Sequence, residues 1–196
     1  MTHVQTAQPR FLARAAIACL VGGLATAIYV EITGAAVEDP VRSTFSEYVH
    51  TEQGARLVGV AMLMVGFAAL SVVGALINQA THASRLVGVF GVGLVLLAVF
   101  PQEPADMALT WHGAIHRYVA LTAFVALPIA ALLLRDRVLR FLAVGSLTTL
   151  VVFVATFVPA TGTRAYSGLA ERVLLAVDLV ILVVMARRAV RQSTAP

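Results

Sequence analysis

Six long apolar runs divide this chain, and they restrict what it can fold into more than any other feature does. Most come close to the ~20 residues that an α-helix needs to cross the hydrocarbon core of a bilayer. Backbone N–H and C=O groups have no water to bind in lipid, so a crossing segment must be a helix or a barrel strand. The runs lack the alternation of a barrel strand, which favours helices. We expect spans at about 15–32, 57–77, 86–100, 112–134, 141–159 and 170–186.

The composition supports a chain embedded in lipid. Hydrophobic residues make up 60% of the 196, and only 12% are charged, whereas a soluble domain carries roughly 25% charged residues. A water-soluble core cannot absorb this much apolar surface. We therefore predict an all-α, polytopic bundle of six transmembrane helices that forms a single integral membrane domain over residues 1–196. The first run is longer than the apolar core of a signal peptide, so we expect a retained span.

The arginines predict the orientation of the spans. The chain has 14 basic residues, all of them arginine, and a net charge of +4. With six crossings, nine arginines fall on the side that holds both termini and five on the other. Cytoplasmic loops carry the excess of basic residues in membrane proteins. We therefore expect both termini in the cytoplasm, and the basic character then indicates topology and no nucleic-acid partner.

Small residues recur within the first three spans. Glycines at positions such as 22, 23, 66 and 91 allow helix backbones to approach closely in lipid. Packing within one chain is the simpler interpretation, and a homo-oligomer joined through the same faces is the alternative. The lone cysteine, Cys19, lies in the first span and is expected to pack there.

Three polar stretches fall at the outer ends of spans. They cover residues 43–50, 110–117 and 168–172, and alternation of the spans places all three at one membrane depth. Ionisable groups at such a depth are costly and usually face the interior of a bundle. The candidate catalytic residues are Glu47 and Glu171. The candidate ligand-binding residues are Ser46, Tyr48, Trp111, Arg117 and Arg172.

The third candidate group is a pair of histidines at the start of the fourth span. His112 and His116 are four residues apart and so share one helical face, as in helices that give two imidazoles to a metal. Zinc needs a third protein ligand, which Glu171, Glu47 or His50 could supply. The alternative is that Thr110 caps the helix and the spacing has no metal role. Zinc or another divalent metal is thus a possible cofactor.

Two further groups of charges have open interpretations. Arg172 or Arg117 could form an ion pair with Glu47 or Glu171, and the serines and threonines at 43–46 could cap the second helix. Asp178 is the acid deepest in a span and needs a partner, for which Ser71, Thr148 and an inner arginine are candidates. A satisfied hydrogen bond and a role in proton relay are both compatible with its position.

Four segments in a fixed order carry a resemblance. They are Ser46-Glu47-Tyr48, Val99-Phe100-Pro101-Gln102-Glu103-Pro104, Trp111-His112-Gly113-Ala114-Ile115-His116-Arg117 and Gly168-Leu169-Ala170-Glu171-Arg172. This order resembles the bacterial membrane proteins grouped as domain of unknown function 998. The resemblance covers nearly the whole chain and implies six spans in a bacterial cytoplasmic (inner) membrane, but no reaction. A weaker similarity to the membrane hydrolases that include alkaline ceramidases implies a zinc site with several histidines.

Three functions remain open from the sequence. The first is a non-enzymatic protein whose outer-leaflet pocket binds membrane lipid, a small lipid-like molecule or a partner. The second is an intramembrane metal-dependent hydrolase that acts on a lipid-like substrate, with His112 and His116 on the metal and Glu171 or Glu47 as third ligand or general base. The third is a small transporter that uses Asp178. The sequence does not decide whether the protein is an enzyme.

Overall fold

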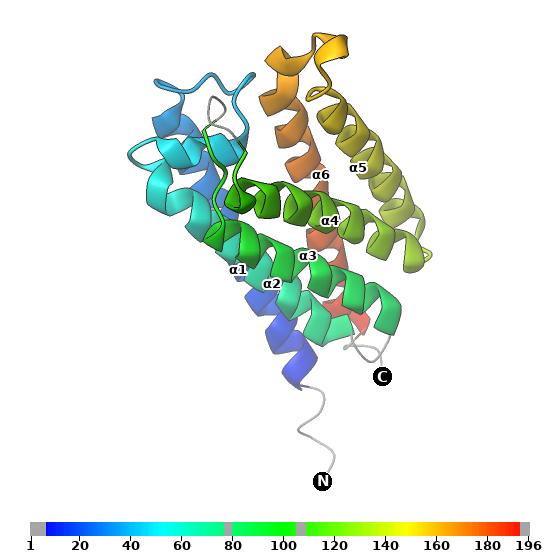
Figure 1. Cartoon of the computed structure of the whole chain (residues 1–196). Coiled ribbons are helices and arrows are strands. Elements are labelled where there is room, and N and C mark those ends of the chain that lie inside the picture. The colour runs from blue at the N-terminus through cyan, green and yellow to red at the C-terminus, as the bar shows by residue number, and fades with distance from the viewer. Residues whose placement is uncertain (1–6, 77–79, 105–108, 193–196) are drawn as a thin grey trace.

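The computed structural model describes residues 7–76, 80–104 and 109–192, and within them the chain is built from helices alone (Figure 1). The predicted end of the second span at residue 77, part of the following loop, Asp106 and both tails lie outside the described residues. The prediction of an all-α fold is confirmed. The α-helices are α1 (Ala7–Gly34), α2 (Gly54–Leu76), α3 (Thr81–Val99), α4 (Trp111–Leu133), α5 (Arg137–Ala155) and α6 (Ser167–Gln192). Short 3₁₀ helices are η1 (Phe45–His50), η2 (Pro159–Thr161) and η3 (Arg164–Tyr166).

The helices indicate a membrane-embedded protein. Among the described residues, the five helices α1 to α5 are long and apolar enough to cross a membrane. Helix α6 has the length but is more polar, since Asp178 lies in its middle and charged residues lie near both of its ends. Five of the predicted spans therefore meet the criteria of length and composition, and a sixth crossing by α6 stays a prediction.

The helices pack in the order of the chain. Each α-helix contacts the next one along the chain, and α6 also contacts α1. Helix α6 also contacts α2 and α4. This position explains part of its composition, because Glu171 and Asp178 are buried against neighbouring helices instead of facing lipid. The start of α1 and the end of α6 lie at the same end of the bundle (Figure 1); we call this the inner end and the opposite one the outer end.

Glycines bring the first three helices into close contact, as predicted for packing within one chain. Gly66 of α2 and Gly91 of α3 face each other so closely that a Cβ on either would lie 3.0 Å from the carbonyl oxygen of the other. Gly23 of α1 similarly packs against Ala61 and Val65 of α2. Cys19 is partly buried and packs against the core, as expected.

At the inner end, Asp136 joins α5 to α6. Its carboxylate accepts a hydrogen bond from the Leu139 backbone N–H at 2.9 Å and so caps α5. It also forms an ion pair with Arg188 of α6. The Leu139 hydrogen bond, reinforced by Arg188, holds the pKa of Asp136 below its ordinary value. Asp136 is therefore expected to be ionised at neutral pH and to hold the inner ends of α5 and α6 together.

Candidate functional site

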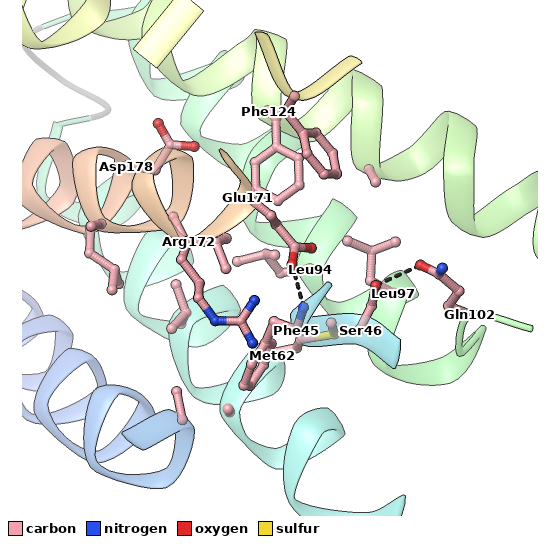
Figure 2. Close-up of a pocket in the computed structure, with 18 of the residues that line it drawn as sticks. Phe45, Ser46, Met62, Leu94, Leu97, Gln102, Phe124, Glu171, Arg172 and Asp178 are labelled. Carbon is pink, nitrogen blue, oxygen red and sulfur yellow. Dashed lines mark hydrogen bonds between the residues drawn. The ribbon is translucent and has the colours of Figure 1, made fainter. Parts of the chain in front are cut away.

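A half-open cavity of about 460 Å³ lies in the outer half of the bundle, and residues from all six α-helices line it. Most of the lining is apolar, with Phe90, Leu94 and Phe124 deep in the wall and Phe45 of η1 at the outer end. Its volume falls within the range of roughly 300–1,000 Å³ that is usual for sites that bind small molecules. Figure 2 shows polar side chains, among them Glu171, Arg172 and Asp178, around this apolar space.

The rim of the cavity is apolar and partly exposed. Five lining residues, from α1, α4, α5 and the turn that follows α5, are each between 45% and 49% exposed. The four on α1, α4 and α5 lie within helices that are apolar enough to cross a membrane, so in a bilayer they would face acyl chains. The cavity therefore opens toward the side of the bundle. The rim residues are Leu24, Ile28, Leu121, Val154 and Phe157.

The outer end of the cavity is closed by η1, which folds back between helices. The buried carboxylate of Glu171, near the start of α6, accepts a hydrogen bond from the Phe45 backbone N–H (Figure 2). Ser46 donates through its Oγ to Oε1 of Gln102 at 2.6 Å, which ties η1 to the segment after α3. Both contacts join residues far apart in sequence, so they fix the position of η1 over the cavity.

Two ion pairs support this outer end. Arg172 lies 2.8 Å from the carboxylate of Glu31 on α1, and its guanidinium also donates to the carbonyl oxygen of Ser43 at 2.8 Å. The second pair joins Arg164 of η3 to Glu47 of η1 at 3.1 Å. The alternative in which Arg172 or Arg117 pairs with Glu47 or Glu171 is therefore wrong for the described residues. The basic partner of Glu47 comes from η3, and the acidic partner of Arg172 comes from the end of the first span.

Tyr48 is fully buried beneath Arg172, with the guanidinium carbon 5.3 Å from the centre of its ring. Burial, together with the nearby carboxylate of Glu31, raises the pKa of Tyr48 above its ordinary value. The phenol therefore stays neutral at physiological pH. Tyr48 does not line the cavity, and its position under Arg172 indicates that it supports the ion pair between Arg172 and Glu31.

The capping groups near η1 differ in part from the prediction. Glu47 accepts a hydrogen bond from the Thr44 backbone N–H at 2.6 Å, so Thr44 and Glu47 stabilise the start of η1. Helix α2 begins later, and its first N–H, that of Gly54, donates to Oγ1 of Thr51 at 3.0 Å. The residues at 43–46 therefore do not cap the second α-helix. The physical reason is that η1 intervenes between them and α2.

The two histidines of α4 have different surroundings. His116 is buried, lines the cavity and lies with Nδ1 2.7 Å from the carbonyl oxygen of Phe100. His112 lies one turn nearer the outer end, is exposed, and packs its ring against Phe100 with 5.7 Å between ring centres. Thr110 caps α4 by accepting from the His112 backbone N–H at 3.2 Å, as the alternative interpretation predicted. Among the described residues, no three His, Cys, Asp or Glu side chains gather in a way that could hold a metal.

Asp178 lies deep in the bundle and is 2% exposed. Its Oδ1 accepts a hydrogen bond from Ser146 Oγ of α5 at 2.6 Å. Its Oδ2 is buried without a hydrogen-bond partner among the described residues, and the residue lines the cavity. The predicted partners of Asp178 are therefore wrong. Ser71 instead bonds its own helix at the Phe67 carbonyl, at 2.8 Å.

Comparison with known proteins gives a match over almost the same residues as the helical fold. A family model described as a protein of unknown function (DUF998) matches residues 7–188, which include all of α1 to α5 and most of α6. The chain belongs to the DUF998 family. No curated protein and no solved structure matches it. The match confirms the family named from the sequence, whereas six spans and a bacterial origin stay predictions. The family brings no activity with it, so the function of this DUF998 protein must be inferred from its own geometry.

The structure brings together part of the predicted site. Of the candidates in this DUF998 chain, Ser46, His116, Arg117, Glu171 and Arg172 line the cavity. Those that do not line it are Glu47, Tyr48, Trp111 and His112. Trp111 is 64% exposed at the start of α4. The roles of these residues in catalysis, ligand binding and metal binding stay predictions.

Sequence reasoning missed three contributors to the site. Gln102 lies in the segment that carried the family resemblance, and it binds Ser46. Glu31 was counted with a span, yet it is the ion-pair partner of Arg172. Ser146 has no distinguishing sequence signal, because a lone serine in an apolar helix is common where helices pack.

Proposed function

We propose that this chain is a multi-pass membrane protein that binds a lipid-like amphiphile in its outer-leaflet cavity. The observation that carries the proposal is the cavity itself, which combines about 460 Å³ of mostly apolar space, an apolar rim and a polar outer end. An amphiphile fits this arrangement because its chain would occupy the apolar space and its polar group would reach Glu171, Arg172, Gln102 or Ser46. Sites of this kind fix orientation with few polar groups in an apolar pocket.

The proposal includes six crossings of a bacterial cytoplasmic membrane, with one membrane domain and both termini in the cytoplasm. Two observations support it. The start of α1 and the end of α6 lie at the same end of the bundle (Figure 1), and α6 contacts α1, α2, α4 and α5. The excess of arginines at this end of the bundle supports a cytoplasmic location. The proposal leaves the oligomeric state open.

Cysteine labelling tests this topology. In a Cys19→Ser background, a cysteine at exposed His50 is expected to react with a membrane-impermeant maleimide added to intact cells, and a cysteine at exposed Arg137 is expected to be protected. Arg137 should react only after the membrane is opened. Labelling of both positions in intact cells, or protection of both, would exclude the six-span topology, and the reverse pattern would contradict the cytoplasmic location of the termini.

Filling the cavity is expected to remove the bound amphiphile. Ala27 of α1 lines the cavity, whereas Ala25 on the same helix is exposed and does not. Ala27→Phe should place a ring in the ligand space and weaken binding by about tenfold or more, a loss of about 1.4 kcal/mol or more. Ala25→Phe adds the same ring outside the cavity and should leave binding unchanged. Mass spectrometry of lipids that remain with the purified variants measures the difference, and equal recovery from both would contradict the proposal.

The two other functions have less support from the geometry. A metal-dependent hydrolase needs a third ligand beside His112 and His116, and the described residues offer no such group. Zinc at these histidines therefore stays a prediction from the sequence. A transporter would use Asp178, which lines the cavity. Transport would also need a polar path across the bilayer, whereas the cavity lies in the outer half of the bundle and supports binding alone.

A further inference from the structure

Asp178 presents one free carboxylate oxygen at the inner limit of the cavity. The side chain is 2% exposed, and Ser146 Oγ occupies only Oδ1, at 2.6 Å. Oδ2 is buried and has no partner in the described part of the chain. Buried polar groups are almost always hydrogen-bonded, and one that is not needs an explanation. A ligand group in the cavity would supply the missing partner.

The charges around the cavity favour a cation as that partner. Arg172, the basic side chain nearest to Glu171, is already paired with Glu31. Neither Glu171 nor Asp178 forms an ion pair within the described residues. These two carboxyl groups lie seven residues apart on α6, about 10.5 Å along the helix and on the same face. Arg117 of α4 also lines the cavity, but it is exposed and forms no ion pair with either carboxyl group in the described structure.

We propose that the amphiphile carries a protonated amine and that this amine binds Oδ2 of Asp178. The inference rests on the proposed function, since it names the class of ligand that occupies the same cavity. A carboxylate accepts hydrogen bonds and cannot donate them, and hydrogen bonds between ionised partners are roughly twice as strong as neutral ones. An ammonium group donates to the free oxygen, and its positive charge would stabilise an ionised carboxylate that is otherwise costly within a membrane. A carboxylate or phosphate ligand would bring no donor to that oxygen.

Two probes with the same chain length test this proposal. Dodecylamine is protonated at neutral pH, because its amine resembles that of lysine with a pKa of about 10.4, and 1-dodecanol is neutral. Binding of each to the full-length protein in phosphatidylcholine nanodiscs is measured by calorimetry, with the signal of empty nanodiscs subtracted. The wild-type protein is expected to bind dodecylamine about tenfold or more tightly than dodecanol.

Two substitutions separate the role of Asp178 from that of overall charge. Asp178→Asn keeps the size of the side chain, loses its charge, and should weaken dodecylamine binding by about ten- to a hundredfold. Binding of dodecanol should change less than about twofold. Asp136→Asn is the matched control, because it removes the same charge from a residue outside the cavity that Asn can still serve as helix cap. It should leave the binding of both probes unchanged.

The outcomes distinguish this inference from the proposed function. If both probes bind with equal affinity to the wild-type protein, or if Asp178→Asn retains dodecylamine binding, the proposal of an amine at Asp178 fails while the amphiphile site survives. If dodecylamine does not bind at all, the proposal of an amine fails as well. If in addition Ala27→Phe and Ala25→Phe retain the same lipids, the amphiphile site fails with it. The wild-type comparison stands by itself should the Asn variant not fold.

Discussion

Arg172→Met is expected to lower the free energy of unfolding by about 2–3 kcal/mol. The arginine joins three parts of the outer end: it pairs with Glu31 of α1, donates to the Ser43 carbonyl before η1, and donates to the Gly168 carbonyl of its own helix. The side chains of Arg172 and Glu31 are only 21% and 26% exposed. Removal of the guanidinium would leave a largely buried carboxylate without its partner, which is the costly way to break a pair.

An exposed ion pair in the same region, Arg42 with Asp39, provides the control. Arg42 and Asp39 lie 3.5 Å apart, but their side chains are 73% and 53% exposed. Exposed pairs contribute about 0–1 kcal/mol, so Arg42→Met should have almost no effect. Unfolding in detergent, followed by circular dichroism, measures both variants. The double variant Arg172→Met, Glu31→Gln should recover part of the loss, because it no longer leaves the carboxylate unpaired. Equal stability of the two single variants would disprove the role given to Arg172.

Gly168→Ala is expected to cost about 1–3 kcal/mol, the range for overpacking a closely packed site. Gly168 is buried at the start of α6, where the loop before η1 crosses the helix. A Cβ at this position would overlap the backbone carbonyl oxygens of Pro40 and Ser43. The backbone is held on both sides of the glycine. Ser167 Oγ donates to the Arg42 carbonyl oxygen at 2.6 Å, and the Leu169 backbone N–H donates to the Val41 carbonyl oxygen at 3.0 Å.

The same substitution at Gly145 is the matched control. Gly145 lies within α5, and a Cβ there would meet nothing within 4 Å. Alanine is preferred to glycine inside a helix by up to about 1 kcal/mol, so Gly145→Ala should be neutral or stabilising. The shift in thermal midpoint, measured by fluorescence-detected gel filtration after heating, compares the two variants. A stable Gly168→Ala protein would mean that the crossing loop is not held where the structure places it.

The sequence was sufficient for the helical class and for the approximate place of each α-helix, although α1 begins at Ala7 and α6 ends at Gln192, well outside the predicted spans. Lipid accepts only segments whose backbone is satisfied internally, so the positions of the apolar runs largely determine the helices. Helix α6 was harder to judge from composition alone, because its acidic residues Glu171 and Asp178 are buried against other helices. The segment before α2 was predicted as caps, and it contains η1 instead, because long-range hydrogen bonds to Glu171 and Gln102 hold it in place.

The site was predicted only in part because the rotation of each helix about its axis is not written in an apolar sequence. Successive residues of an α-helix are turned by about 100°, so positions two apart point in nearly opposite directions. Thr148 was considered as partner for Asp178, whereas Ser146 is the observed donor. The same argument applies along the axis of α4. His116 lies deep enough to be buried, while His112 is one turn closer to the end and is exposed.

The half-exposed rim of the cavity affects how a bound molecule would exchange. Leu121 of α4 and Val154 of α5 lie on different helices, and both are 45% exposed at the cavity. A molecule that enters between them travels within one leaflet and never has to dissolve in water. Occupancy then follows the mole fraction of the ligand among the surrounding lipids, so even a nearly insoluble compound could equilibrate quickly. The lipid composition of the host membrane, more than any aqueous supply, would set what the protein carries.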